Sequence, residues 1–200
     1  AGAEPAAPID LTEVSVVFSR GLTARYFALR ARPPSALADV IDVRGWFVRP
    51  WSKPVADPRF WSGRLFAQVN YVDLARVESI ARLIPQPFRL QRGNGALRAW
   101  IDFEALAVKR ARADLAFTDV DLQLRPDLEP LRLSSLQGRI TQLGWRTGST
   151  QGQDLALSRL TLQGAGGLKI APTDLTYSES HSVDASGVAG AGHTEVTASA

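Results

Sequence analysis

Cysteine and methionine are absent from the 200 residues, and histidine occurs only twice. Without cysteine the chain has no disulfide framework, no thiolate nucleophile and no cysteine zinc site. The two histidines, His181 and His193, lie in a segment rich in Gly, Ser and Ala, residues 178–193, whose composition predicts a mobile connector. Such a connector cannot hold a base against a substrate. We therefore expect no metal, no cofactor and no catalytic residue.

Long apolar runs are missing as well. No stretch of about 18 apolar residues occurs, so the sequence predicts no membrane-spanning helix. The first eight residues contain only Ala, Gly, Glu and Pro, without an initiator Met or a signal-peptide pattern. We expect a piece of a longer protein whose membrane anchor or export signal lies outside these residues.

Positive charge is concentrated in the first half of the chain. Residues 1–100 carry a net charge of +6, and residues 101–200 carry −3. A basic half can indicate a nucleic-acid or anionic-lipid partner. Its arginines, however, alternate with apolar residues, as in Arg64-Leu65 and Arg98-Ala99, which is typical of the solvated face of a strand. The five tryptophans are scattered and no basic helix is evident, so we expect no nucleic acid as a partner.

Alternation at period two dominates the sequence and indicates strands with one apolar face. The fold class we predict is mainly β: a twisted, elongated antiparallel sheet shaped like a gutter, with one short amphipathic helix. That helix is expected over 73–84, where Asp73 can cap it and Pro85 ends it. Changes of phase within 131–140 and 154–163 predict bulges. Hairpin turns are expected at 92–95, from Asn94-Gly95, and at the Gly-rich segment 164–169.

Apolar residues of three predicted strands share one face, and the sheet exceeds what one short helix can cover. This face must therefore pack against another sheet, fold on itself or hold apolar ligands. The candidate groove residues are Leu65, Ala67, Val69, Leu97, Ala99, Ile101, Phe103, Leu115 and Phe117. The carboxylate pairs Asp102/Glu104 and Asp119/Asp121 could in principle supply an acid and a base, but the residues around them are typical of a solvated strand face.

The order of several motifs resembles the repeating unit of the large AsmA-like proteins of the YhdP type, found in the envelopes of Gram-negative bacteria. The resemblance covers about residues 55–177, and its motifs are Trp61–Val69, Val72–Ala75, Gly95–Phe103, Ala113–Phe117, Leu136–Ile140 and Pro172–Thr176. It implies a periplasmic β-sheet gutter, in a parent protein anchored to the inner membrane, whose apolar trough carries phospholipid acyl chains toward the outer membrane. The expected partners are phospholipid and neighbouring repeats of the parent. The resemblance carries over no catalytic residue.

Together these observations predict three parts: a strand-rich segment over 1–54 that fits the family only loosely, the repeat unit over 55–177, and a connector over 178–200 that ends in the start of a further strand. Three hypotheses on function remain open. The first is a non-enzymatic lipid conduit, with arginines at its rim facing phosphates. The second is an envelope scaffold or assembly factor whose apolar faces pack against each other without lipid. The third is an enzyme acting on envelope glycans through Asp102 and Glu104.

Overall fold

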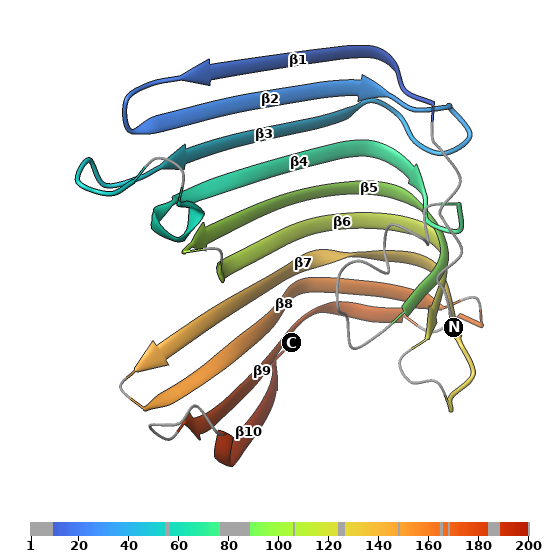
Figure 1. The fold of residues 1–200 in the computed structure, drawn as a ribbon. Coiled ribbons are helices and arrows are strands. Elements are labelled where there is room, and N and C mark those ends of the chain that lie inside the picture. Colours follow the sequence, from blue (N-terminus) through green and yellow to red (C-terminus); the bar gives the residue numbers. More distant parts are fainter. Residues whose placement is uncertain are drawn as a thin grey trace, which may run out of the picture.

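The computed structural model describes residues 10–54, 57–76, 89–105, 107–123, 127–147, 149–164, 166–167, 169–183 and 189–199. In this part of the chain ten strands form one antiparallel sheet, and each strand pairs with the next along the sequence (Figure 1). The strands are β1 (Thr12–Arg20), β2 (Ala24–Arg32), β3 (Ile41–Val48), β4 (Ser62–Asp73), β5 (Arg89–Glu104), β6 (Ala107–Gln123), β7 (Leu131–Thr147), β8 (Thr150–Gly164), β9 (Lys169–Val183) and β10 (Ala189–Ser199). The predicted mainly β, antiparallel fold is confirmed.

The sheet is open and strongly curled, so that one face is concave (Figure 1). Bulges supply much of this curvature, because each one bends its strand and increases the local twist. Pairing shifts register between Leu133 and Ser135 of β7, and the opposing part of β6 contains Asp119 with a φ of 53°. A second shift follows Leu157 of β8, next to Arg159, whose φ is 54°. The phase changes read from the sequence at 131–140 and 154–163 are thus confirmed as bulges.

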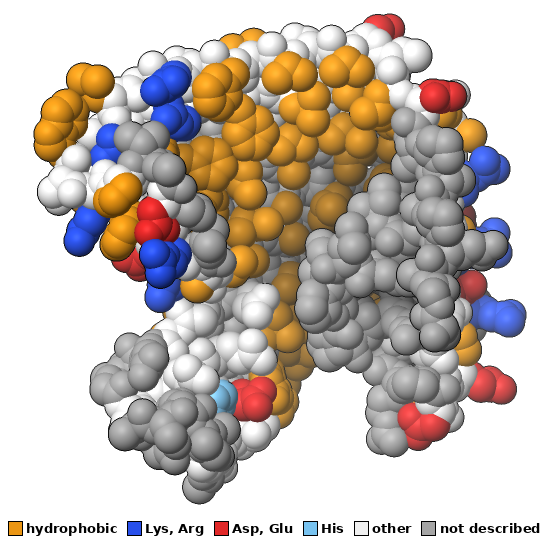
Figure 2. Space-filling view, viewed as in Figure 1, with side chains coloured by type: hydrophobic (Ala, Val, Ile, Leu, Met, Phe, Trp, Pro, Cys, Tyr) orange, Lys and Arg blue, Asp and Glu red, His pale blue; other side chains and the backbone are white. Residues whose placement is uncertain are grey.

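One face of the sheet is apolar across most of its width. Residues that pair directly across strands project to the same face. One such row crosses seven successive strands and contains only apolar residues: Val43, Ala67, Ala99, Ala113, Ile140, Leu157 and Leu175. Figure 2 shows apolar side chains spread over the concave face. We call this surface the trough.

Among the residues that the structure describes, few side chains are fully buried. They are Ala31, Ala38, Val72, Phe117, Val120, Leu133 and Leu136, and all but Ala31 form a single cluster. The whole chain exposes 13489 Å², whereas a compact globular protein of this mass exposes roughly 9,200 Å². The sheet therefore does not close on itself, and the buried cluster of the described residues lies at one end of the trough.

The carboxy-terminal connector predicted over 178–193 is wrong for its described residues. β9 continues to Val183 and β10 begins at Ala189, with His193 paired to Ser180 and Thr194 to Glu179. Backbone hydrogen bonding across a ladder does not require apolar side chains, which is why composition alone misjudged this segment. The further strand expected near 194–200 is confirmed and starts earlier.

The hairpin predicted at 92–95 is also wrong, because Asn94 and Gly95 lie inside β5. Gly95 pairs with Phe117 of β6 on one side and Val72 of β4 on the other. A Cβ at Gly95 would lie 2.0 Å from the carbonyl oxygen of Ala116 and 2.8 Å from the ring of Phe117. The glycine thus permits close approach of two strands, as isolated strand glycines often do.

The turn predicted over 164–169 is confirmed: the Gly167 amide donates to the Gly164 carbonyl at 3.1 Å, and Gly167 has a φ of 88°. Most of the predicted helix, residues 77–84, lies outside the described residues. Its first residues form a turn in which Asp73 accepts a hydrogen bond from the Ala75 amide at 3.1 Å. The helical segment that the structure does describe is the short 3-10 helix η1 (Pro58–Phe60).

Pairing of the strands continues past both boundaries of the predicted three-part division. β3 pairs with β4, which joins the first segment to the second, and β9 runs through residue 178. The division into three parts stays a prediction, since strand pairing alone does not define repeat boundaries.

Candidate functional site

The candidate groove residues lie on the concave face of β4, β5 and β6. Leu65, Ala67 and Val69 of β4 pair with Ile101, Ala99 and Leu97 of β5. Leu97 in turn pairs with Leu115 of β6, while Phe103 lies opposite Gly63 and Phe117 opposite Gly95. The alternation of the sequence therefore placed all nine on one face, and their contact with a ligand stays a prediction.

The trough differs between its two ends. At one end Phe117 is only 3% exposed and packs with Val120 in the buried cluster, so it belongs to the core. Towards the other end Leu65 and Ile101 stay half-buried, with apolar surface open to the concave side. A ligand in the trough would therefore contact the middle and the open end, while Phe117 packs in the core at the other end.

Three aromatic rings line the concave face at the open end. The ring centroids of Phe27 and Phe47 are 5.8 Å apart, and those of Phe47 and Phe103 are 5.1 Å apart. The rings lie over glycines of the neighbouring strands, since a Cβ at Gly45 would lie 2.2 Å from the Phe27 ring and one at Gly63 would lie 2.8 Å from the Phe47 ring. Sequence reasoning missed Phe27 and Phe47. The sequence feature that indicates them is a glycine within a strand, Gly45 or Gly63, because a strand glycine often lies opposite an aromatic ring.

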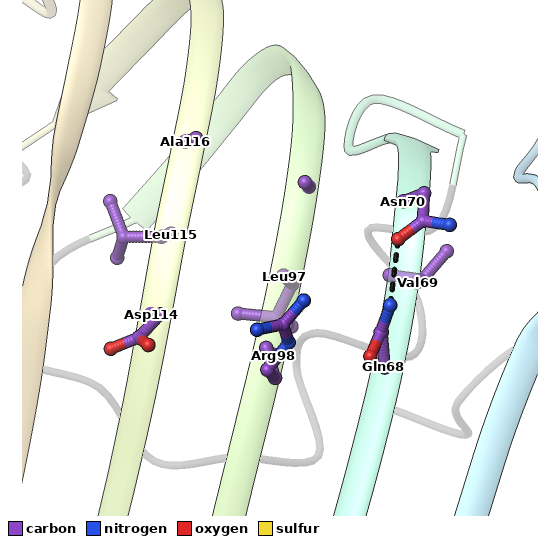
Figure 3. A pocket seen from close by; sticks show the side chains of 9 residues that line it. Gln68, Val69, Asn70, Leu97, Arg98, Asp114, Leu115 and Ala116 are labelled. Carbon is purple, nitrogen blue, oxygen red and sulfur yellow. Dashed lines mark hydrogen bonds between the residues drawn. The ribbon is translucent and has the colours of Figure 1, made fainter.

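The opposite, convex face carries polar and charged residues that pair across strands. Arg64 of β4 binds Asp102 of β5 at 2.5 Å, and Arg139 of β7 donates two hydrogen bonds to Asp114 of β6. The Arg139 guanidinium holds the pKa of Asp114 below its ordinary value. Figure 3 shows the neighbouring part of β4, β5 and β6, where Gln68, Arg98 and Asp114 alternate along their strands with Val69, Leu97 and Leu115.

Aromatic contacts add to the convex face. The Arg112 guanidinium lies 4.6 Å from the centroid of the Trp100 ring, and the rings of Phe66 and Trp100 are 5.5 Å apart. Cation–π and tilted aromatic pairs of this kind stabilise neighbouring strands. The convex face is thus a surface of cross-strand side-chain pairs, distinct in chemistry from the trough.

The carboxylates considered as an acid and a base are not arranged as a catalytic pair. Asp102 is bound to Arg64 on the convex face, and Glu104 is exposed at the end of β5. Asp119 adopts the left-handed conformation at a bulge. Among the described residues no group of three or more His, Cys, Asp or Glu could hold a metal ion, and no helix is long and apolar enough to cross a membrane.

A polar patch interrupts the apolar surface at one end of β8 and β9. The Gln151 amide and the His181 ring are 2.8 Å apart. Glu179 accepts hydrogen bonds from the Tyr177 hydroxyl at 3.1 Å and from Gln153 at 3.5 Å. The contact with Glu179 raises the pKa of Tyr177. His181 is therefore held in a strand by a side-chain partner, which corrects the expectation that both histidines lie in a mobile tail.

These features define an open β-sheet trough with an apolar concave face and a charged convex face. Comparison with models of known protein families shows which family the chain belongs to. The model of the YhdP protein family matches residues 6–197, and the chain belongs to this family. The match includes β1–β3 and nearly all of β10, beyond the stretch in which the sequence motifs were recognised. No curated protein and no solved structure matches the chain. Membership indicates a protein of the bacterial envelope in a family not known for enzymatic activity.

Proposed function

We propose that this chain is a non-enzymatic segment of a periplasmic lipid conduit, in which phospholipid acyl chains lie along the trough on their way between the inner and outer membranes. In this proposal the parent protein is anchored to the inner membrane, and neighbouring repeats continue the trough.

The observation that carries the proposal is the uninterrupted apolar row from Val43 to Leu175. It crosses seven strands, and much of the surface around it is half-buried and not covered by another layer of described structure. Each methylene moved from water onto such a surface contributes about 0.8 kcal/mol when fully buried. An acyl chain is long enough to cross several strands, so the gain accumulates without any single specific contact.

The shape of the trough also suits the two parts of a phospholipid. Acyl chains need a continuous apolar floor, while a headgroup can remain hydrated at the open side of the concave face. The arginines Arg64 and Arg139 are paired with carboxylates on the convex face. They are therefore poorly placed to meet phosphates in the trough, and the headgroup contacts must come from other residues.

Extraction of the purified protein with organic solvent and mass spectrometry of the extract tests the proposal. We expect phospholipid to co-purify at about one molecule or more per protein, and Ile101→Asp to reduce it severalfold, because a charge in the acyl path is costly. A folded protein that carries no lipid would favour the scaffold hypothesis.

A second test separates the conduit from the enzyme hypothesis. Cells lacking the full-length parent and its relatives are complemented with the parent carrying Asp102→Asn and Glu104→Gln together. We expect full rescue of the envelope-permeability defect, since surface ion pairs are worth only about 0–1 kcal/mol. Loss of rescue at normal protein abundance would favour an enzyme, because removing a general acid or base lowers a rate by about 10² to 10⁴.

A further inference from the structure

The sheet is split at one end between β6 and β7. Pairing of β6 with β7 begins only at Arg110 and Leu143. In contrast, β6 pairs with β5 as far as Ala107, and β7 pairs with β8 as far as Thr147. Figure 1 shows the end of β7 diverging from the start of β6. We call this opening the β6–β7 notch.

The notch is an open depression of about 550 Å³. Its walls come from Ala107–Lys109 of β6, Gly144 and Trp145 of β7, residues 151–153 of β8, and Glu179 and His181 of β9. It adjoins the trough directly, because Ala111 and Leu155 of the apolar face lie two residues further along the same strands. A ligand whose chains lie in the trough can therefore place its polar end in the notch.

The notch contains one cation and one anion that are both available to a ligand. Lys109 is exposed, and neither Lys109 nor Glu179 forms an ion pair with another described residue. Within the described part of the chain, Glu179 accepts hydrogen bonds only from the neutral donors of Tyr177 and Gln153. An ammonium group would replace water at this carboxylate with a charge-assisted hydrogen bond, and a phosphate would do the same at the Lys109 ammonium.

We propose that the β6–β7 notch binds the headgroup of the lipid held in the trough, and that it prefers a zwitterionic headgroup carrying a primary ammonium and a phosphate. The ammonium lies at Glu179 and the phosphate at Lys109, with Gln151, Gln153 and His181 as polar neighbours. This inference rests on the proposed function, because it requires acyl chains in the trough.

Competition between two lipids tests the preference. The purified chain is incubated with vesicles containing equal amounts of phosphatidylethanolamine and phosphatidylglycerol with identical acyl chains, separated from the vesicles, and its bound lipids are quantified by mass spectrometry. We expect an enrichment of phosphatidylethanolamine of about fivefold, which a single partly exposed charge contact can supply. Glu179→Gln should reduce the enrichment below about twofold.

Two further variants make the result specific. Glu179→Lys should reverse the preference in favour of phosphatidylglycerol, because it replaces the anion with a second cation. Glu195→Gln is the matched control: it removes a carboxylate from β10 at a position that pairs with Ser178, on the convex face. It should leave the enrichment at about fivefold. Circular dichroism confirms that each variant keeps its sheet.

The outcomes separate this inference from the proposed function. Lipid bound without a headgroup preference, or a preference unchanged by Glu179→Gln and Glu179→Lys, overturns the headgroup site and leaves the conduit standing. The absence of bound lipid in the wild-type chain overturns the proposed function itself. A preference altered equally by Glu195→Gln would show that net charge, and not the notch, selects the lipid.

Discussion

Two single substitutions, Val120→Asp and Val43→Asp, measure how far the trough is open to water. Val120 is 0% exposed, inside the buried cluster. Val43 is half-buried on the concave face, between Leu29 of β2 and Ala67 of β4. Valine and aspartate are similar in size, and the poor strand propensity of aspartate applies at both positions. The two variants therefore differ mainly in whether the new carboxylate can reach water.

The expected costs are well separated. At Val120 the change removes a buried side chain and leaves a carboxylate without water or partner, which should lower the free energy of unfolding by about 4 kcal/mol or more. At Val43 only part of the transfer free energy of a valine is lost, about 1 kcal/mol, because the carboxylate stays hydrated. Urea unfolding of delipidated protein, followed by tryptophan fluorescence, measures both. Equal costs of about 4 kcal/mol at the two sites would refute the reasoning, since they would mean that the concave face is covered.

Two further predictions concern strand packing and pH. Gly95→Ala should lower the free energy of unfolding by about 2 kcal/mol, because the new Cβ would meet the Ala116 carbonyl oxygen. Gly166→Ala is the control and should change this free energy by less than about 0.5 kcal/mol, because a Cβ there would have no atom within 4 Å. The midpoints of urea unfolding measure both effects. The lowered pKa of Asp114 means that its contact with Arg139 stabilises the sheet above the unfolded pKa near 3.9, and that this contribution disappears as the pH falls through the folded pKa. Asp114→Asn should therefore be less stable than wild type at pH 7 and nearly equal at the acid end of the titration, and a difference that grew on acidification would contradict this assignment.

Period-two alternation predicted the sheet and its apolar face because side-chain direction in a strand depends only on position along the chain. Leu65, Val69 and Ile101 could be assigned to one face before their partners were known. The phase changes in β7 and β8 were equally readable, since a bulge shifts the apolar positions by one residue.

Other features depend on partners that the sequence does not reveal locally. Asn94-Gly95 has the composition of a turn, but the packing of Gly95 against Phe117 outweighs that local preference. The polar strands β9 and β10 have little apolar periodicity, and their order comes from backbone pairing with the adjacent strands, which side-chain composition does not reveal. The notch follows from where the β6–β7 ladder stops, which no local pattern encodes.

A photo-crosslinking amino acid placed at Ile101, and separately at its neighbour Trp100, tests the central claim most directly. Ile101 projects into the trough and pairs with Leu65, whereas Trp100 projects to the convex face beside Phe66 and Arg112. After irradiation in cells, mass spectrometry should find a phospholipid adduct on the protein labelled at position 101 and none on the protein labelled at position 100. Folded protein without an adduct at 101, or with equal adducts at both positions, would contradict the account of the concave face as the path of the acyl chains.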